Sequence, residues 1–380
     1  MINKALLVSA IIILGVWLLF TSPVQQVKPD TSDESPLLLN ERKVHSIVKT
    51  DLKESTAIAT YETTNNEKDY IVDCSLEQTI DDKEFDEYSQ SAKTFLKSLS
   101  NSNLKDKKLE YTLFSEPLEG DTRLSLLLKF NESFPNNPLV LQEIMRECEN
   151  LNDNKECNTK LIETALASDK NNGAMWLKLL FFNASREDDE GIIYAVQELV
   201  KSTYFDDGFV RRVKLYSKSL EGSIANNNHF NLIIAFGEEV IKLPAYSTIT
   251  KWCKQNKNST LEADICLQLG NYMEKRSKVL IDQVIGIAIK KIIFEAQGKL
   301  SLFEAADIEF KNTREYLGNE QVVKASSLMI ADESLFKSWL NNYENYGELK
   351  ASKLLVEEAI NLSKNENYSP CENETTLTSE

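Results

Sequence analysis

The chain has 380 residues, and its 43 Lys and Arg against 59 Asp and Glu give a formal net charge of −16. With 42% hydrophobic and 27% charged residues, 12 glycines and 8 prolines, the composition excludes a collagen, a wholly disordered chain and a polytopic membrane protein. The negative charge would repel a nucleic-acid backbone over most of the surface, so we expect no nucleic-acid partner.

The chain begins with an apolar segment. Residues 5–20 (ALLVSAIIILGVWLLF) carry no charge and follow Lys4. A helix of this length, extended by its flanks at about 1.5 Å per residue, is at the short end of what crosses a ~30 Å hydrocarbon layer. Because no Ala-x-Ala-like cleavage site follows, we predict an uncleaved signal anchor over residues 1–20; a cleaved export signal and a buried N-terminal helix are the alternatives. The charge of Lys4 predicts a cytoplasmic N-terminus and an exported body.

The cysteines bear on the compartment. An even number without a C-x-x-C pair favours neither a zinc ribbon nor a thioredoxin-like site, and it favours disulfides in an oxidising compartment. A composition rich in Asn, Lys, Ile and Glu suits a bacterium. We therefore predict a single-pass protein of the bacterial inner membrane with its body in the periplasm, or a protein secreted to the periplasm if the signal is cleaved. The six cysteines are Cys74, Cys148, Cys157, Cys253, Cys266 and Cys371.

After the anchor we expect four further parts. Residues 21–44 hold three of the eight prolines and read as a flexible linker. Residues 45–120 form an N-terminal cap region, irregular or β, because short β-branched and aromatic runs lie within 56–75 and helical spacing begins only after residue 81. Residues 121–362 form a helical domain, and residues 363–380 a polar tail.

The helical domain contains a repeat. Pro138, Gly173 and Gly208 are each 35 residues apart, follow polar turns and open helical runs. A further step of 35 reaches Leu243, directly before Pro244, which can open a helix. Polar breaks near residues 150, 185, 222 and 254 divide each unit in two. The pattern predicts four helix hairpins in tandem between about 138 and 270.

The second unit carries a family resemblance. Counted from Gly173, Trp176 and Leu179 fall at the fourth and seventh places, where tetratricopeptide repeats (TPRs) keep an aromatic residue and a leucine. The third unit departs from the pattern, with Arg211 and Lys214 at these places. The chain thus resembles a degenerate TPR-like helical-repeat protein, which implies an all-α fold, an α-solenoid of helix hairpins, and a protein or peptide partner.

Two disulfides follow from the same register. Cys148 and Cys253 are three periods apart, at the eleventh place of their units, and Cys157 and Cys266 stand near the starts of the second helices. Facing residues near the turn of a hairpin lie within the reach of a disulfide. We predict the pairs Cys148–Cys157 and Cys253–Cys266; whether the two remaining cysteines pair stays open.

Downstream the repeat loosens. Capping-box spacing after Ser259 and Ser301 marks two helix starts. Residues 279–294 are strongly apolar but contain four polar or charged residues, which favours a buried helix over a second membrane span. A last hairpin is expected over residues 333–343 and 348–362.

Motifs for catalysis are absent from the sequence. His45 and His229 are the only histidines, which excludes H-E-x-x-H and multi-His metal sites. No two glycines are two residues apart, which excludes G-x-G-x-x-G and G-x-S-x-G. Ser334 and Lys337 have S-x-x-K spacing without a later K-T-G. We therefore predict no catalytic, cofactor-binding or metal-ligating residue and no cofactor.

Two residue groups allow a functional reading and a structural one. Acidic clusters at residues 81–82, 188–190 and 206–207 could supply paired carboxylates, but they stand where helices begin, so capping is the preferred interpretation. Trp176 and the pair Phe181–Phe182 are expected in the core rather than at a ligand site.

The functional expectation is a membrane-tethered periplasmic scaffold or adaptor. It would hold an envelope protein or peptide without catalysis and reach the membrane through its N-terminal helix. The alternative is a cell-envelope glycan hydrolase that uses a carboxylate pair on a helical-repeat body.

Overall fold

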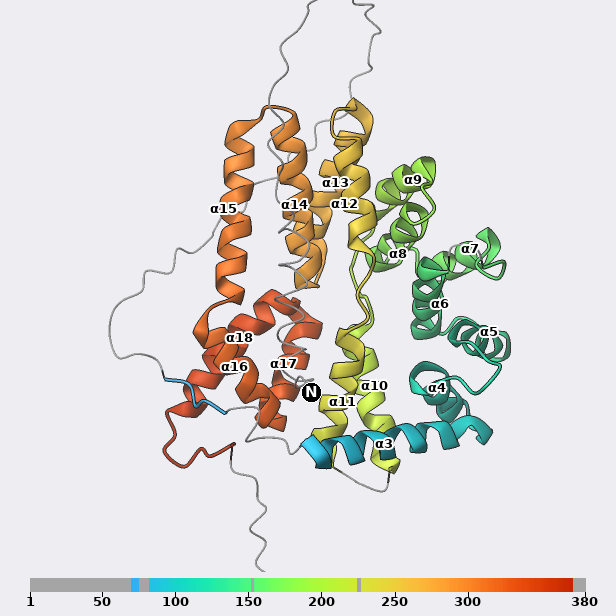
Figure 1. Cartoon of the computed structure of the whole chain (residues 1–380), viewed down its shortest axis with the longest axis vertical. Helices are drawn as coiled ribbons and strands as arrows, with labels where there is room; N and C mark the ends of the chain where they lie inside the picture. Colours follow the sequence, from blue (N-terminus) through green and yellow to red (C-terminus); the bar gives the residue numbers. More distant parts are fainter. Residues whose placement is uncertain (1–69, 75–81, 152–153, 224–226, 372–380) are drawn as a thin grey trace, which may run out of the picture.

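The computed structural model describes residues 70–74, 82–151, 154–223 and 227–371 (Figure 1). Within them the chain is all-α, with sixteen α-helices, two short 3-10 helices and no strand. The anchor, the linker, residues 45–69 and 75–81 of the cap region and residues 372–380 of the tail lie outside the described residues. Residues 70–74 have no regular secondary structure, and most of residues 82–114, also assigned to the cap region, is helical rather than irregular or β. Among the helices that are described, none combines the length and the apolar character that spanning a membrane requires.

The helices follow one another with short connections. In chain order they are α3 (Asp82–Ser98), η1 (Leu99–Asn101), α4 (Lys105–Phe114), α5 (Arg123–Ser133), α6 (Pro138–Asn150), α7 (Thr159–Ser168), α8 (Gly173–Ala184), α9 (Asp189–Leu199), α10 (Phe209–Ser219), η2 (Leu220–Gly222), α11 (Asn228–Val240), α12 (Tyr246–Gln255), α13 (Thr260–Arg276), α14 (Leu280–Ala296), α15 (Leu300–Leu317), α16 (Glu320–Ala331), α17 (Glu333–Tyr346) and α18 (Glu348–Ser363).

The four predicted hairpins are present as α6–α7, α8–α9, α10–α11 and α12–α13. Their starts follow from local chemistry. Asn137 caps α6 by accepting hydrogen bonds from the amides of Leu139 and Val140, and Pro138 occupies the first helical position. Gly208 precedes α10 with a φ of +75°, a left-handed conformation that favours glycine. The expected period therefore marks real helix starts.

The hairpins do not stack in sequence order. α6 packs against α8, α8 against α12, and α9 against α13, so the second hairpin contacts the fourth. The stack continues through α5 and α4 at one end and through α14 and α15 at the other (Figure 1). The third hairpin packs instead against α3, α4 and α17. The fold is helical-repeat-like, as expected, and its tandem order is interrupted at the third unit.

The residues of α10 explain the interruption. Arg211 pairs with Asp206 at 2.9 Å, and Lys214 reaches Glu344 on α17 at 2.6 Å. Two cationic side chains thus occupy places that would face a neighbouring repeat, and they have polar partners elsewhere. The apolar face of α10 lies on the other side, where Tyr216 stacks on the Phe114 ring of α4 with centroids 4.4 Å apart.

An aromatic cluster joins the third hairpin to α17. The Phe209 and Tyr343 rings are 5.4 Å apart, and the Phe236 ring lies 5.3 Å from Phe336 and 5.7 Å from Trp339. Aromatic pairs of this kind stabilise an interface beyond the apolar area that they bury. The predicted last hairpin is confirmed as α17–α18, and it covers the third unit.

The predicted buried helix is α14, which crosses α13 closely. A Cβ atom at Gly286 would lie 2.6 Å from the carbonyl oxygen of Gly270, so glycine is required for the backbones to approach this far. The two lysines of α14 are paired: Lys290 contacts Glu274 at 2.5 Å, and Lys291 contacts Asp307. A helix starts close to Ser301, as predicted, but Ser301 does not cap it: α15 begins at Leu300, and its N-cap Lys299 makes no side-chain cap hydrogen bond.

The structure contains three disulfides. Cys148–Cys157 and Cys253–Cys266 close the first and fourth hairpins near their turns, with Cα atoms 5.4 and 5.8 Å apart. Cys74–Cys371, the pair that the sequence left open, has Cα atoms 5.3 Å apart and joins the segment before α3 to the segment after α18. The amide of Val72 also donates to the Ser363 hydroxyl at 2.9 Å. The two ends of the described body are therefore linked.

Candidate functional site

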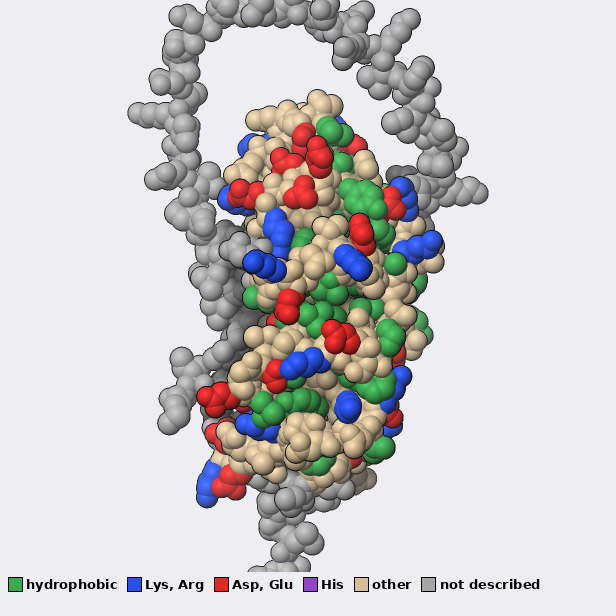
Figure 2. Space-filling model, turned by 90° about the vertical axis from the view of Figure 1, so that its right-hand side faces the viewer, with side chains coloured by type: hydrophobic (Ala, Val, Ile, Leu, Met, Phe, Trp, Pro, Cys, Tyr) green, Lys and Arg blue, Asp and Glu red, His purple; other side chains and the backbone are tan. Residues whose placement is uncertain are grey.

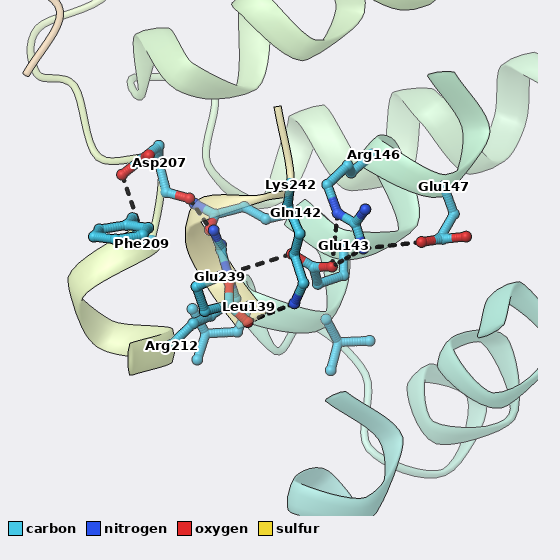
Figure 3. A network of polar contacts seen from close by, with 12 residues as sticks. Leu139, Gln142, Glu143, Arg146, Glu147, Asp207, Phe209, Arg212, Glu239 and Lys242 are labelled. Carbon is cyan, nitrogen blue, oxygen red and sulfur yellow. Dashed lines mark hydrogen bonds and ion pairs between the residues drawn. The ribbon is translucent and has the colours of Figure 1, made fainter. Parts of the chain in front are cut away.

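A network of buried charges lies where α6, α10 and α11 meet (Figure 3). Its centre is Arg212 of α10, which is 5% exposed. The Arg212 Nε donates to a carboxylate oxygen of Glu239 on α11 at 2.7 Å and lies 3.4 Å from a carboxylate oxygen of Glu143 on α6. Its Nη1 donates to the carbonyl of Asp207 at 2.9 Å. One guanidinium thus connects the third hairpin to the stack.

Both carboxylates of the network have a second cation. Arg146 donates from Nε and Nη2 to one oxygen of Glu143, at 2.9 and 2.6 Å, and Lys242 donates to Glu239 at 2.5 Å. Burial raises the pKa of Glu143, but Arg212, Arg146 and Lys242 together outweigh burial and hold it well below its ordinary value. Arg146 also donates to a carboxylate oxygen of Glu147 at 2.9 Å, so three cations face three carboxylates, and the network holds the helices together.

A second group of carboxylates lies beside the first. Asp282 of α14 is 2% exposed, and burial raises its pKa to about 6. Its two oxygens accept hydrogen bonds from the hydroxyls of Tyr246 and Ser277, both at 2.6 Å. Glu348 accepts from the amide of Leu280 at 2.8 Å, and burial raises its pKa to about 7. Both carboxylates therefore lie at the N-terminal turn of α14, Asp282 as one of its residues and Glu348 as the acceptor of its first amide.

Asp207 and Lys178 complete this interior. Burial raises the pKa of Asp207, whose carboxylate accepts from the amide of Phe209 at 3.1 Å. Burial and the neighbouring Arg212 lower the pKa of Lys178 on α8. The Lys178 side chain is partly buried and has no hydrogen bond or ion pair with any described residue. Within the described parts of the chain, no three His, Cys, Asp or Glu side chains are placed to bind a metal ion.

A groove of about 360 Å³ runs along the exposed side of α12, next to α14. Its floor is formed by two buried side chains, Tyr246 of α12 and Ile285 of α14. The Tyr246 hydroxyl is the group that donates to Asp282, so the groove lies directly above the carboxylates. The rest of its lining comes from α12 and is polar: Ser247, Thr250, Lys251, Lys254 and Gln255.

The groove is large enough for a small ligand or a short peptide segment.

A shallower groove of about 400 Å³ lies between α17 and α18 and includes Glu357 and Glu358. The two grooves differ in charge, because the lining of the first contains lysines and no acid. Figure 2 shows the side of the molecule that bears α4 to α9, where acidic and basic side chains are interspersed. The groove on α12 is the candidate functional site, because it is the deeper of the two and its lysines have the sign opposite to the net charge of the chain.

The acidic clusters serve the helix starts as predicted. Asp188 caps α9 by accepting from the amide of Gly191 at 3.0 Å, and Asp206 accepts from the amide of Gly208 at 2.8 Å. Asp189 accepts from the Trp252 indole at 2.7 Å, which ties α9 to α12. These carboxylates therefore have structural partners; the side chains of residues 81–82 lie outside the described ones.

Two of the three predicted core residues are buried, whereas Phe182 is half-buried at the edge of the core, with the Arg186 guanidinium 3.6 Å from the centre of its ring. Trp176 and Phe181 are buried, and the Trp176 indole donates to the carbonyl of Lys170 at 2.7 Å. The S-x-x-K pair has no joint role, because Lys337 pairs with Glu333 at 2.5 Å.

The sequence did not single out the groove residues, the buried charge network or Asp282. The groove has one sequence signal: α12 reads YSTITKWCKQ, a helix with two lysines and no acid in a strongly acidic chain. The third unit has a second signal, the cations Arg211 and Lys214 at repeat positions, but they pair with Asp206 and Glu344 and do not belong to the buried network around Arg212. Neither signal states which helices meet.

Comparison with known proteins yields no relative. No family model matches the chain, no curated protein matches it, and no solved structure matches it.

Proposed function

We propose that the protein is a membrane-tethered scaffold or adaptor of the bacterial periplasm, and that it binds a protein or peptide partner in the groove along α12. The observation that carries the proposal is this groove, with an apolar floor and a polar, hydrogen-bonding wall. Such a combination is typical of a site that positions a ligand through a few polar groups.

The state of the carboxylates supports binding over catalysis. A glycan hydrolase needs a proton donor and a second carboxylate that both face the substrate. Both oxygens of Asp282 accept hydrogen bonds from protein hydroxyls, and Glu348 is bonded to a backbone amide of α14. The carboxylates of this group thus have protein partners and favour the scaffold function over the hydrolase.

Site-specific photocrosslinking in cells tests the proposal. A photoreactive amino acid at Thr250, which lines the groove, should give one discrete adduct with an envelope protein. The same amino acid at Glu163, an exposed position on α7, is the control and should not give that adduct. The captured protein, once purified, should bind the intact chain and compete with the crosslink.

Failure of the proposal has a clear form. If Thr250 yields no adduct, or if Thr250 and Glu163 yield the same adducts, the groove is not a partner site.

A further inference from the structure

The groove along α12 has a charge opposite to that of the chain. Its lining contributes two lysines and no acid, whereas the chain carries a formal charge of −16. Lys254 has no ion pair with the part of the chain that the structure describes. Lys251 has only a distant partner, Glu187, at 4.0 Å, and both of these side chains are exposed. Both ammonium groups are thus accessible to a ligand.

The remaining lining fits a peptide backbone. The Ser247 hydroxyl and the Gln255 amide are exposed and can donate and accept. The Thr250 hydroxyl donates to the carbonyl of Tyr246 at 2.9 Å, which leaves its oxygen lone pairs for an incoming donor. Between these groups, Tyr246 and Ile285 offer an apolar surface.

The length of α12 limits the ligand. A helix of 10 residues at about 1.5 Å per residue spans about 15 Å. An extended peptide rises about 3.3 Å per residue, so the groove accommodates about four or five residues. Lys251 and Lys254 are three positions apart, and such residues have Cβ atoms about 5–6 Å apart on one helix face. Alternate side chains of an extended peptide lie on one side, about 7 Å apart.

We infer that the groove recognises an acidic peptide segment of the partner, with two Asp or Glu residues separated by one residue. Lys251 and Lys254 each bind one of the two carboxylates. The inference rests on the proposed function and specifies the chemistry of its partner. A nucleic acid is a poor occupant, because the formal charge of −16 on the chain repels a long polyanion.

Fluorescence polarisation with the full-length protein in detergent micelles tests this inference. The probes are three labelled pentapeptides, Glu-Thr-Glu-Thr-Glu, Ser-Thr-Ser-Thr-Ser and Lys-Thr-Lys-Thr-Lys, together with a labelled polyphosphate. We expect the acidic peptide to bind most tightly and to weaken when the salt is raised from about 0.05 to about 0.5 M.

Charge reversal supplies the matched comparison. The double variant Lys251→Glu/Lys254→Glu should lose about tenfold or more in affinity for the acidic peptide, since it replaces two attractions by two repulsions. The control is Lys350→Glu/Lys353→Glu, which has the same spacing and the same change in net charge on exposed positions of α18. It should change the affinity by less than about twofold.

Three outcomes would overturn the inference. They are equal binding of the neutral and acidic peptides, equal losses in the two double variants, and tighter binding of polyphosphate than of the acidic peptide. If any of these occurs while Thr250 still crosslinks to one partner, the acidic motif is wrong and the scaffold function stands. If no peptide binds and Thr250 gives no adduct, both the acidic motif and the scaffold function are wrong.

Discussion

The second and third hairpins begin at equivalent positions of the same period, yet they pack in different ways. In α8, ten of the twelve residues are buried, and the helix lies between α6 and α12 in the stack. In α10, five of the eleven residues are buried, and one of these five is Arg212. The period determines where a hairpin begins, whereas the residue types on its faces determine which helices it contacts.

Removal of Arg212 should have the largest effect on this arrangement. Arg212→Met leaves Glu143 and Glu239 buried without their shared cation, so the free energy of unfolding should fall by about 3–5 kcal/mol. Urea unfolding followed by circular dichroism measures the change. The control is Lys214→Met on the same helix, which breaks an exposed pair with Glu344 and should cost about 0–1 kcal/mol. Similar losses in both variants would contradict a special role for the buried network.

The hairpin disulfides distinguish the two regions in a second way. Both hairpin disulfides belong to stacked hairpins, and the third hairpin contains no cysteine. Replacing Cys148 and Cys157 by serine should lower the free energy of unfolding by about 3 kcal/mol, because the closed loop is short. Unfolding measurements check this value, and peptide mapping of alkylated, unreduced protein checks the pairing. Free thiol at Cys148 or Cys253 would show that the pairs do not form.

Glycine-to-alanine substitutions should change stability in opposite directions in the stack and in the third hairpin. Gly286→Ala inserts a Cβ against the backbone of α13 and should destabilise the protein by about 1–3 kcal/mol. Gly237→Ala on α11 of the third hairpin meets open space and should be neutral or stabilising by up to about 1 kcal/mol. Thermal unfolding of the two variants gives the comparison. Destabilisation by both changes would mean that α11 is packed more tightly than the structure describes.

The smallest predicted effect is a dependence on pH. Burial raises the pKa of Asp282 to about 6 in the folded chain, with Asp207 raising it and Lys178, Ser277 and Tyr246 lowering it. Between pH 4 and 6 the folded state therefore holds more protons than the unfolded state, and the free energy of unfolding falls as the pH rises through this window. The loss should be about 1 kcal/mol between pH 5 and 7.

Asp282→Asn should flatten this slope. The variant keeps the shape of the side chain but does not titrate, so stability measured across the same pH range isolates the contribution of Asp282. Glu348, whose pKa is raised to about 7, continues to titrate in the variant and extends the slope to higher pH. A slope unchanged by the substitution would assign the pH dependence to other groups.

Much of the local fold could be predicted from the sequence. Asn137, Pro138 and Gly208 are residues that begin helices, and the spacing of Trp176 and Leu179 indicates an amphipathic helix, so the hairpins follow from short-range chemistry. The departure of the third unit was visible in Arg211 and Lys214. The contact of this unit with α17 could not be predicted, because α17 lies more than a hundred residues after α10 and no sequence period relates the two helices.

The candidate site was less predictable for the same reason. Tyr246 and Ile285 form one floor only because α12 and α14 pack together, and this contact depends on α13 and α14 crossing at two glycines. Lys251 and Lys254 read as ordinary exposed residues of a helix. Only the packing of α12 against α14 shows that these two lysines line a groove.

The disulfide between Cys74 and Cys371 makes almost the whole described body a covalent circle. A protease that cuts one peptide bond between these cysteines leaves both fragments attached, so a nicked chain migrates as one species until it is reduced. A pulling force applied to the chain before Cys74 is transmitted through the disulfide to the segment after α18. The force therefore does not act on α3 alone. The fragments of a nicked chain therefore separate only when the disulfide is also reduced.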